Sequence, residues 1–215
     1  MIILIDATNK DQYPELVESM FRLRKRVFID QMKWNIPHQD GLEIDQFDDE
    51  DTIYFVATVD GKNCIGTWRG YPTTKPYMVE TVFPQFFGDH EIVKNKHAYE
   101  FSRSAVDWEA VGMDGRKVRL VHIEIFCATV EWCIMHNVFE AVSFTDPRMT
   151  RRTSYLYGAP KWAGEVMDCG DGGMAQCMIY QPSFGQLSKF RNELNIASPV
   201  IAQYSSASGE FAKVG

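Results

Sequence analysis

Residues 100 to 103 read Glu-Phe-Ser-Arg, and they stand directly before a glycine-containing turn and a long amphipathic segment. The order of these segments predicts a central strand followed by a turn and a helix. A carboxylate, a hydroxyl and a guanidinium are costly to bury in such a strand unless they are paired or used in a reaction. We therefore expect this strand to carry the chemistry of the protein.

Strand geometry constrains how these side chains can cooperate. Alternation places Glu100, Ser102 and Ser104 on one face of a regular strand, and Phe101 and Arg103 on the other. Either a bulge turns one of the charged residues or the two contact different parts of a ligand. The alternative without function is a structural ion pair between Glu100 and another arginine. We expect a bulge or a splayed strand, with Glu100 facing the reacting group and Arg103 on the other side of the pocket.

The periodicity of apolar residues predicts a mixed sheet with helices on its faces, an α/β (α+β) sandwich in a single domain. The expected strands are 1–7, 52–59, 64–71, the one around Glu100, 141–144, 161–166 and 174–180. The expected helices are a first one that buries Leu16, Met20, Leu23 and Val27, one after the turn at 111–117, and one over 147–157. Asp60-Gly61 predicts a hairpin turn. The helix after residues 111–117 is expected to bury Val121, Ile125, Ala128, Trp132 and Met135. The domain is expected to span residues 1–196, followed by a mobile tail at 197–215.

Composition excludes several classes of function. The formal net charge of −7 argues against a nucleic-acid-binding protein. No apolar run approaches the roughly 20 residues of a membrane span, and no signal peptide begins the chain, so a cytoplasmic protein is expected. The five cysteines have no Cys-x-x-Cys spacing and are expected to be buried free thiols. The motifs for zinc, nucleotide triphosphates and dinucleotides are absent, so no metal and no cofactor is expected.

Basic residues nevertheless form three islands. They are Arg22, Arg24, Lys25 and Arg26; Arg116, Lys117 and Arg119; and Arg148, Arg151 and Arg152. Such islands are either solvated surface or sites for a compact anion, with phosphates or an acidic carrier protein as candidates. The second island follows two glycines at a helix start, where free N–H groups suit a pyrophosphate or phosphopantetheine arm. An ordinary glycine-containing loop is the alternative there.

The long polar stretch from residue 33 to 51 offers carboxylates beside aromatic rings. Asp45 and Asp48 are three residues apart, and Phe28 and Trp34 precede them. This combination suits an ammonium or sulfonium ligand, since aromatic rings add cation–π contacts. A solvated acidic surface is the alternative, and the calcium-loop pattern is absent.

Together these residues resemble the acyl-homoserine-lactone synthase (autoinducer synthase) family. The resemblance rests on Arg24, Phe28 and Trp34, on the sequence from Glu43 to Asp48, on Arg69, on Phe83 and on Glu100 to Arg103. It covers residues 1–110 well and the remainder in outline. It implies a three-layer fold related to the N-acetyltransferases, with a V-shaped splay in the sheet that admits a phosphopantetheine arm. The implied reaction is acylation of the amine of S-adenosylmethionine by a thioester, followed by lactonisation and release of methylthioadenosine.

The resemblance also assigns roles to residues. Glu100 is the implied general base, and Ser102 is expected to hydrogen-bond near the thioester. The S-adenosylmethionine pocket is expected to comprise Arg24, Phe28, Trp34, Asp45, Asp48, Arg69, Phe83 and Arg103. The thioester carrier, acyl-coenzyme A or acyl-carrier protein, is expected to meet Arg116, Lys117, Arg119, Arg148, Arg151 and Arg152.

Some positions depart from the family pattern. Ser104 and Ala105 follow Arg103, where the family usually has a bulky apolar residue, and Gly70 follows Arg69, where the family usually has an apolar one. The stretch from Asp45 to Asp48 and the sequence Val82-Phe83-Pro84-Gln85 resemble members that use acyl-coenzyme A. The residues 140–143 lie about where a strand of the acyl pocket is expected. Two alternatives stay open: an N-acetyltransferase acting on general amines, and a non-catalytic protein that binds a thioester or an adenosyl ligand.

Overall fold

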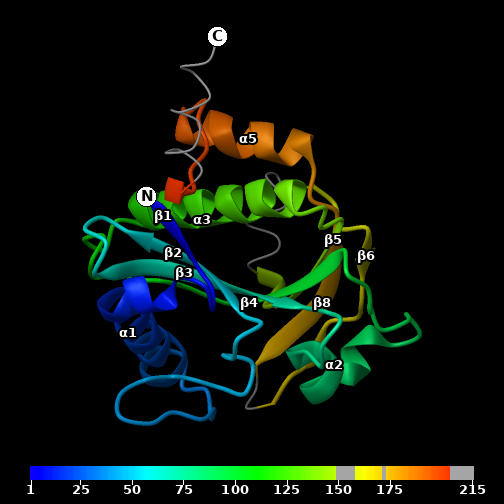
Figure 1. Ribbon diagram of the computed structural model, residues 1–215. Coiled ribbons are helices and arrows are strands. Elements are labelled where there is room, and N and C mark those ends of the chain that lie inside the picture. The colour runs from blue at the N-terminus through cyan, green and yellow to red at the C-terminus, as the bar shows by residue number, and fades with distance from the viewer. Residues whose placement is uncertain (149–157, 171–172, 204–215) are drawn as a thin grey trace.

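The structure is a computed structural model that describes residues 1–148, 158–170 and 173–203. Its centre is a mixed sheet of eight strands in the order β1-β2-β3-β4-β5-β8-β6, with β7 pairing with β8 (Figure 1). The strands are β1 (Ile2–Ile5), β2 (Ile53–Thr58), β3 (Cys64–Pro72), β4 (Ala98–Val106), β5 (Glu140–Thr145), β6 (Trp162–Ala163), β7 (Met167–Asp168) and β8 (Met174–Tyr180).

Helices cover both faces of this sheet and make three layers. The first face carries α3 (Gly115–Met135), against which α5 (Phe184–Leu194) packs. The opposite face carries α1 (Pro14–Arg24) with the π-helix η2 (Lys25–Gln31) on one half, and α2 (Met78–Val82) with η3 (Pro84–Phe87) on the other (Figure 1). The short helix η1 (Lys10–Gln12) precedes α1. The expected sandwich is therefore confirmed.

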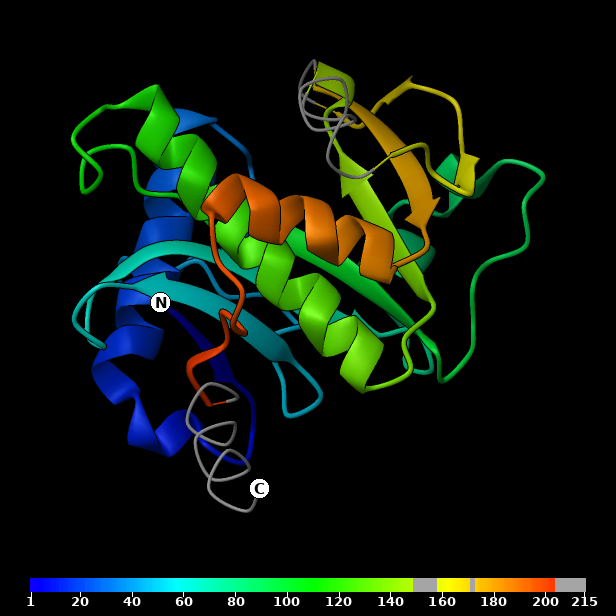
Figure 2. The same ribbon diagram turned by 90° about the horizontal axis from the view of Figure 1, so that it is seen from above.

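The sheet opens between its two central strands. Parallel β4 and β5 pair only from Ala98 with Glu140 to Phe101 with Ser143. Beyond that point β4 continues to Val106 beside β3 alone, and Figure 2 shows β5 and β8 turning away from it. The expected V-shaped splay therefore begins at Ser102.

A bulge interrupts β4 at the same place. Arg69 pairs with Ser102 and Thr67 pairs with Ala105, so that Trp68 lies opposite two residues, Arg103 and Ser104. Arg103 is the extra residue and has a φ of 58°, in the left-handed region. A bulged residue leaves the regular alternation of the strand. The expected bulge is confirmed, but the expectation that Arg103 braces the pocket from the other side is wrong, because its side chain reaches Met78 on the same face as Glu100.

Most expected elements are present, with some differences in detail. The hairpin of β2 and β3 forms across Asp60-Gly61, with Gly61 at a φ of 77°. Met135 was expected to be buried and is 59% exposed, because it is the last residue of α3. Four cysteines are buried free thiols, and Cys169 is half-buried. The helix expected over residues 147–157 lies mostly outside the described residues.

The start of the expected tail has defined contacts. Ile201 is fully buried and bridges to Ile2 of β1, and Gln203 exchanges two hydrogen bonds with the backbone of Leu4. Residues 200–203 therefore cover the edge of β1, whereas residues 204–215 lie outside the described part of the chain. None of the described helices is long and apolar enough to cross a membrane.

Candidate active site

Charged side chains converge on the face of the sheet beside α1, next to the point where β4 leaves β5. We call this group the charged cluster; it comprises Arg24, Glu43, Asp45, Asp48, Arg69 and Arg103. Three guanidinium groups face three carboxylates, and all six side chains are nearly inaccessible to solvent. Burial of so many charges is tolerable only because each is paired and hydrogen-bonded.

Arg24, the last residue of α1, holds one side of the cluster. Its Nε donates to Oε2 of Glu43 at 2.6 Å, and its two Nη atoms donate to the two oxygens of Asp48 at 2.7 and 2.8 Å. This is the bidentate geometry that makes arginine–carboxylate pairs strong. The η2 π-helix begins directly after Arg24, and such helices often occur at functional sites.

A compact turn presents the acidic residues. The backbone N–H of Asp45 donates to Oδ2 of Asp48 at 2.8 Å, and that of Phe47 donates to Oδ1 of Asp45 at 2.9 Å. Burial acts to raise the pKa of Asp48, but Arg24 and Arg69 outweigh it and hold the pKa well below its usual range. Tyr54 of β2 donates its hydroxyl to the same carboxylate at 2.9 Å. Asp48 is therefore a fixed anion at the centre of the cluster.

Arg69 of β3 links this turn to the strand around Glu100. Its Nη1 lies 2.6 Å from Oδ1 of Asp45 and 3.1 Å from Oδ1 of Asp48, and its Nε donates to Oγ of Ser102 at 3.2 Å. Among the described residues, its buried Nη2 has no hydrogen-bond partner. A buried donor without a partner costs free energy, so this atom is suited to an acceptor on a ligand.

The bulge brings Arg103 into the cluster. Its Nε donates to Oε1 of Glu43 at 3.1 Å and its Nη2 to Oδ2 of Asp45 at 2.7 Å. Burial and the neighbouring Arg69 lower its pKa. Its guanidinium lies 5.7 Å from the ring centroid of Phe28, which stacks on Trp34 at 4.9 Å. Trp34 is 39% exposed, so this aromatic pair forms the accessible side of the cluster.

Glu100 lies two residues before Ser102 on β4, and the two side chains share one face of the strand. It is fully buried and accepts hydrogen bonds from the backbone N–H groups of Met78 (3.2 Å) and Val79 (2.8 Å) at the start of α2. Burial raises its pKa to about 7, and these two hydrogen bonds limit the rise. Among the described residues no arginine forms a salt bridge with it, so the structural ion pair considered above is absent. A carboxyl with this pKa can accept a proton near neutral pH.

Phe83 lies apart from the charged cluster, on the other side of the splay. Its ring stacks on Phe144 of β5 at 4.7 Å and an interplanar angle of 20°. Phe86 meets Phe144 edge-on at 4.8 Å. We call these three residues the aromatic wall.

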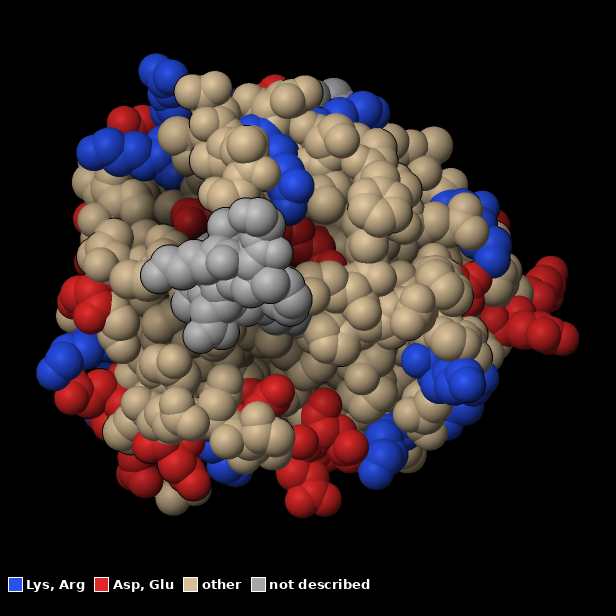
Figure 3. Space-filling model, turned by 45° about the horizontal axis from the view of Figure 1, so that its top comes forward, with Lys and Arg blue, Asp and Glu red and all other residues tan. Residues whose placement is uncertain are grey.

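Apart from Arg24, the described members of the three basic islands do not gather at the site. Arg22 pairs with Glu18, Lys25 with Asp30, and Arg26 with Asp107. Arg119 pairs with Glu193 on α5, and the exposed Arg148 pairs with Asp146. Arg116 and Lys117 are exposed in the first turn of α3, and Arg151 and Arg152 lie outside the described residues. On the face seen in Figure 3, basic and acidic side chains are interspersed.

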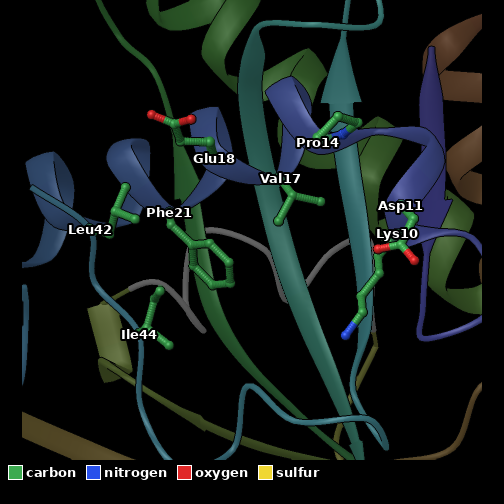
Figure 4. A pocket seen from close by; sticks show the side chains of 8 residues that line it. All are labelled: Lys10, Asp11, Pro14, Val17, Glu18, Phe21, Leu42 and Ile44. Carbon is green, nitrogen blue, oxygen red and sulfur yellow. The ribbon is translucent and has the colours of Figure 1, made fainter. Parts of the chain in front are cut away.

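A shallow groove lies behind the cluster, between η1, α1 and the loop before Asp45 (Figure 4). The buried residue Phe21 forms the inner surface of the groove, and the centroid of its ring lies 5.0 Å from the guanidinium carbon of Arg24. The groove is lined by Lys10, Asp11, Pro14, Val17, Glu18, Phe21, Leu42 and Ile44. It contains none of the expected catalytic residues. Among the described residues, no three His, Cys, Asp or Glu side chains are placed to hold a metal ion.

The structure thus brings most of the expected pocket residues together. Arg24, Asp45, Asp48, Arg69 and Arg103 form one network, and Phe28 and Trp34 lie at its edge. The bridging role of Glu43 was not expected, although this residue stands in the acidic stretch two residues before Asp45. Tyr54 and the two N–H groups that bind Glu100 were not expected either, because the sequence contains no local signal for them.

Comparisons with known proteins identify the family of this chain. Residues 8–157 match the family model described as "Autoinducer synthase". An acyl-homoserine-lactone synthase of Rhizobium radiobacter is 32% identical over 153 residues, which cover 69% of this chain and 72% of the relative. The isovaleryl-homoserine lactone synthase of Bradyrhizobium diazoefficiens is 33% identical over 139 residues, covering 64% of this chain and 60% of that protein. The alignment thus spans less than two thirds of the latter relative.

Solved structures show the same fold over nearly the whole chain. The CoA-dependent acyl-homoserine lactone synthase BjaI, solved with SAM and isopentyl-CoA, superposes with a TM-score of 0.82 at 26% identity, covering 93% of this chain and 91% of BjaI. An N-acetyltransferase from Lactobacillus plantarum superposes with a TM-score of 0.55 at 17% identity, covering 85% of this chain and 98% of that one. At that identity the second likeness concerns the fold alone.

Proposed function

The chain belongs to the autoinducer synthase family, and from this we propose that it is an acyltransferase that makes an N-acyl-homoserine lactone from S-adenosylmethionine and an acyl-coenzyme A. The observation that carries the proposal is the position of Glu100. It is a buried carboxyl with a pKa of about 7, placed between the charged cluster and the opening of the sheet.

The charged cluster suits the first substrate. S-Adenosylmethionine carries an ammonium, a carboxylate and a sulfonium, so its site needs charges of both signs and aromatic surface. The cluster offers three guanidinium groups and three carboxylates, and the Phe28–Trp34 pair supplies the aromatic surface. The unpartnered Nη2 of Arg69 is a donor suited to the substrate carboxylate. The ion pairs hold the cluster rigid before the substrate arrives, which lowers the cost of ordering the site on binding.

Glu100 acts as the general base in this proposal. An ammonium must lose a proton before its nitrogen is nucleophilic, and Glu100 accepts that proton directly or through water. The freed amine attacks the thioester carbonyl carbon, the C–S bond breaks, and the coenzyme A thiolate leaves and takes up the second proton, which the nitrogen releases as it becomes an amide. The donors at Met78 and Val79 hold the carboxylate in one orientation throughout.

Lactonisation completes the reaction. A carboxylate oxygen of the acylated substrate attacks the γ-carbon, the bond from that carbon to the sulfonium sulfur breaks, and methylthioadenosine leaves with the bonding electrons. This step needs the carboxylate and the γ-carbon held close together, which raises the effective concentration of the nucleophile. The rigid arrangement of Arg69 and Arg103 around Asp45 supports that role.

Two observations favour coenzyme A as the carrier. The BjaI structure was solved with isopentyl-CoA, a coenzyme A derivative. In addition, Arg119 and Arg148 already pair with acidic neighbours, so they are poor candidates for docking an acidic carrier protein. Arg116 and Lys117, beside the first turn of α3, are the side chains we propose for the coenzyme A phosphates.

A product assay tests the proposal. The purified protein is incubated with S-adenosylmethionine and acyl-coenzyme A donors of several lengths, and products are identified by mass spectrometry. We expect acyl-homoserine lactone and methylthioadenosine in equal amounts. Acylation of other amines without methylthioadenosine would indicate a general N-acetyltransferase. Binding of S-adenosylmethionine with no product from any donor, including acyl-carrier-protein thioesters, would indicate a non-catalytic binding protein.

A further inference from the structure

Two strands border the opening of the sheet, and they carry different residues there. On β4, the border residue is Ser102, which accepts a hydrogen bond from Arg69 of the charged cluster. On β5, it is Phe144, which lies two residues beyond Val142, the register partner of Glu100. Phe144 and Phe83 are both half-buried, so each residue keeps part of its surface accessible. A thioester placed for attack beside Glu100 therefore has the aromatic wall ahead of it along β5.

The opposite direction along the strands is closed. There the face of the sheet carries Ala98, and Tyr77 and Val93 pack over it; all three are buried. The hydroxyl of Tyr77 donates to the backbone carbonyl of Val93 at 3.0 Å, which fixes the ring in place. An acyl group that starts beside Glu100 cannot extend that way without displacing close-packed core residues, which is destabilising.

Close packing behind the aromatic wall limits how far its rings can move. Phe86 is fully buried behind Phe144. Behind Phe86 lies Gly164, whose backbone N–H donates to the carbonyl of Cys177 on β8 at 2.9 Å. A Cβ on Gly164 would lie 2.6 Å from the carbonyl oxygen of Phe86. The chain after β6 therefore packs directly against η3. Behind Phe144 lies Phe86, and behind Phe86 lies Gly164.

We infer that the aromatic wall, Phe83, Phe86 and Phe144, sets the maximum length of the acyl group and restricts the protein to short donors. The inference rests on the proposed function. Two residues along a strand cover about 7 Å, and an extended acyl chain advances about 1.3 Å per carbon. An acyl chain that runs along β5 from the level of Glu100 therefore reaches Phe144 after about five carbons. The flat ring pair suits a branched chain end, which offers more apolar contact than a straight one of equal length.

This inference moves Phe83 from the S-adenosylmethionine pocket to the acyl side. The stack with Phe144 joins residues from the α2–η3 connection and from β5. Shortening either ring opens the same space, so the two variants should have the same phenotype. A residue of the S-adenosylmethionine pocket would instead change the affinity for that substrate.

The test is a donor competition with the full-length protein. Isovaleryl-, hexanoyl-, octanoyl- and decanoyl-coenzyme A compete for limiting enzyme, and the lactones are quantified by mass spectrometry. The variants are Phe144→Ala, the milder Phe144→Leu, and Phe83→Leu. Phe184→Ala, at a 72% exposed phenylalanine that begins α5, is the matched control. The KM for S-adenosylmethionine is measured for each variant.

We expect the wild-type protein and Phe184→Ala to prefer isovaleryl- over octanoyl-coenzyme A by about tenfold or more, the size of effect that one or two misfitting methylenes produce. Phe144→Ala, Phe144→Leu and Phe83→Leu should each reduce this ratio about tenfold and leave the KM for S-adenosylmethionine unchanged. A wild-type protein that uses octanoyl as well as isovaleryl donors, or variants that make lactone with an unchanged ratio, would overturn the inference. A higher KM for S-adenosylmethionine in Phe83→Leu with an unchanged donor ratio would also overturn it and return Phe83 to the other pocket. Failure of the wild type to make lactone from any donor would instead contradict the proposed function.

Discussion

The two sides of the opening in the sheet carry different kinds of side chain, charged on one side and aromatic on the other. On the side of α1 and β3, three guanidinium groups and three carboxylates are fixed by hydrogen bonds between 2.6 and 3.1 Å long. On the side of β5 and η3, phenylalanine rings pack at centroid distances of 4.7 to 6.1 Å. Directional bonds hold one geometry, whereas apolar packing tolerates exchanges of similar volume. The charged side therefore suits an invariant substrate, and the aromatic side suits a variable one.

Glu100 belongs neither to the charged cluster nor to the aromatic wall, and it lies where the two sides meet. Its carboxylate is held by backbone N–H groups of α2, whose next residues lead to Phe83. One short segment thus orients the base and carries part of the aromatic wall. We expect substitutions on the two sides to have separable effects, and the following predictions test that separation.

The largest effect is expected at the junction. Glu100→Gln removes the proton acceptor and keeps the size of the side chain, so turnover should fall about 10²–10⁴-fold. The affinity for S-adenosylmethionine, measured by calorimetry, should stay within about twofold, because Glu100 forms no bond to the charged cluster among the described residues. Loss of binding together with turnover would show that the junction cannot be separated from the charged side.

A smaller but still large effect is expected inside the charged cluster. Glu43→Gln removes the buried carboxylate that Arg24 and Arg103 share and leaves each arginine only its second partner, Asp48 or Asp45, so the free energy of unfolding should fall by about 3 kcal/mol. The matched control is Glu18→Gln, which removes an exposed pair with Arg22 and should cost less than about 0.5 kcal/mol.

Urea unfolding at neutral pH measures both variants. Equal stabilities of Glu43→Gln and the wild type would mean that the six charges do not act as one structural unit.

An intermediate effect is expected behind the aromatic wall. Gly164→Ala places a methyl group against the carbonyl of Phe86, and overpacking of this kind costs about 1–3 kcal/mol. The displaced η3 should alter the preference among donors while the KM for S-adenosylmethionine stays constant. Gly185→Ala, at a glycine whose added Cβ would meet only Oγ of Ser183 at 3.8 Å, serves as the control. A change in the KM for S-adenosylmethionine alone would break the proposed division between the two sides.

The smallest effect is expected at the surface. Arg148 is largely exposed and pairs with Asp146, so Arg148→Ala should change the KM for acyl-coenzyme A less than about twofold. The double substitution of Arg116 and Lys117 to alanine should raise that KM several-fold and reduce its dependence on salt. Steady-state kinetics at two ionic strengths compare them, and equal effects of the two changes would contradict the proposed phosphate site.

The parts of the molecule that the sequence predicted are those encoded by local spacing. Arg24 and Phe28 are four apart on one helical line, Asp45 and Asp48 are three apart in one turn, and Asp60-Gly61 defines a hairpin by itself. The polar strand at Glu100 was recognisable because buried charge is unusual. From these features the layers of the fold and most members of the charged cluster could be predicted.

The parts that the sequence did not predict depend on contacts between distant segments. The bulge at Arg103 was anticipated, but the direction of its side chain depends on Glu43 and Asp45, about 60 residues earlier. Phe83 and Phe144 meet only because α2 and η3 fold back over β5. Met135 follows the apolar period of α3 but is its last residue, and helical periodicity does not reveal where a helix ends.

The most direct test of the account is the pH dependence of kcat/KM for S-adenosylmethionine, because this parameter reports the ionisation of the free protein. Glu100 must be deprotonated to accept the proton, and its pKa is raised to about 7, so kcat/KM should rise with pH through a step near pH 7. In Glu100→Gln that step should be absent and the remaining activity should follow the ionisation of the substrate amine, near pH 8. A wild-type profile that is flat between about pH 6 and 8, or an unchanged step in Glu100→Gln, would contradict the assignment of Glu100 as the base.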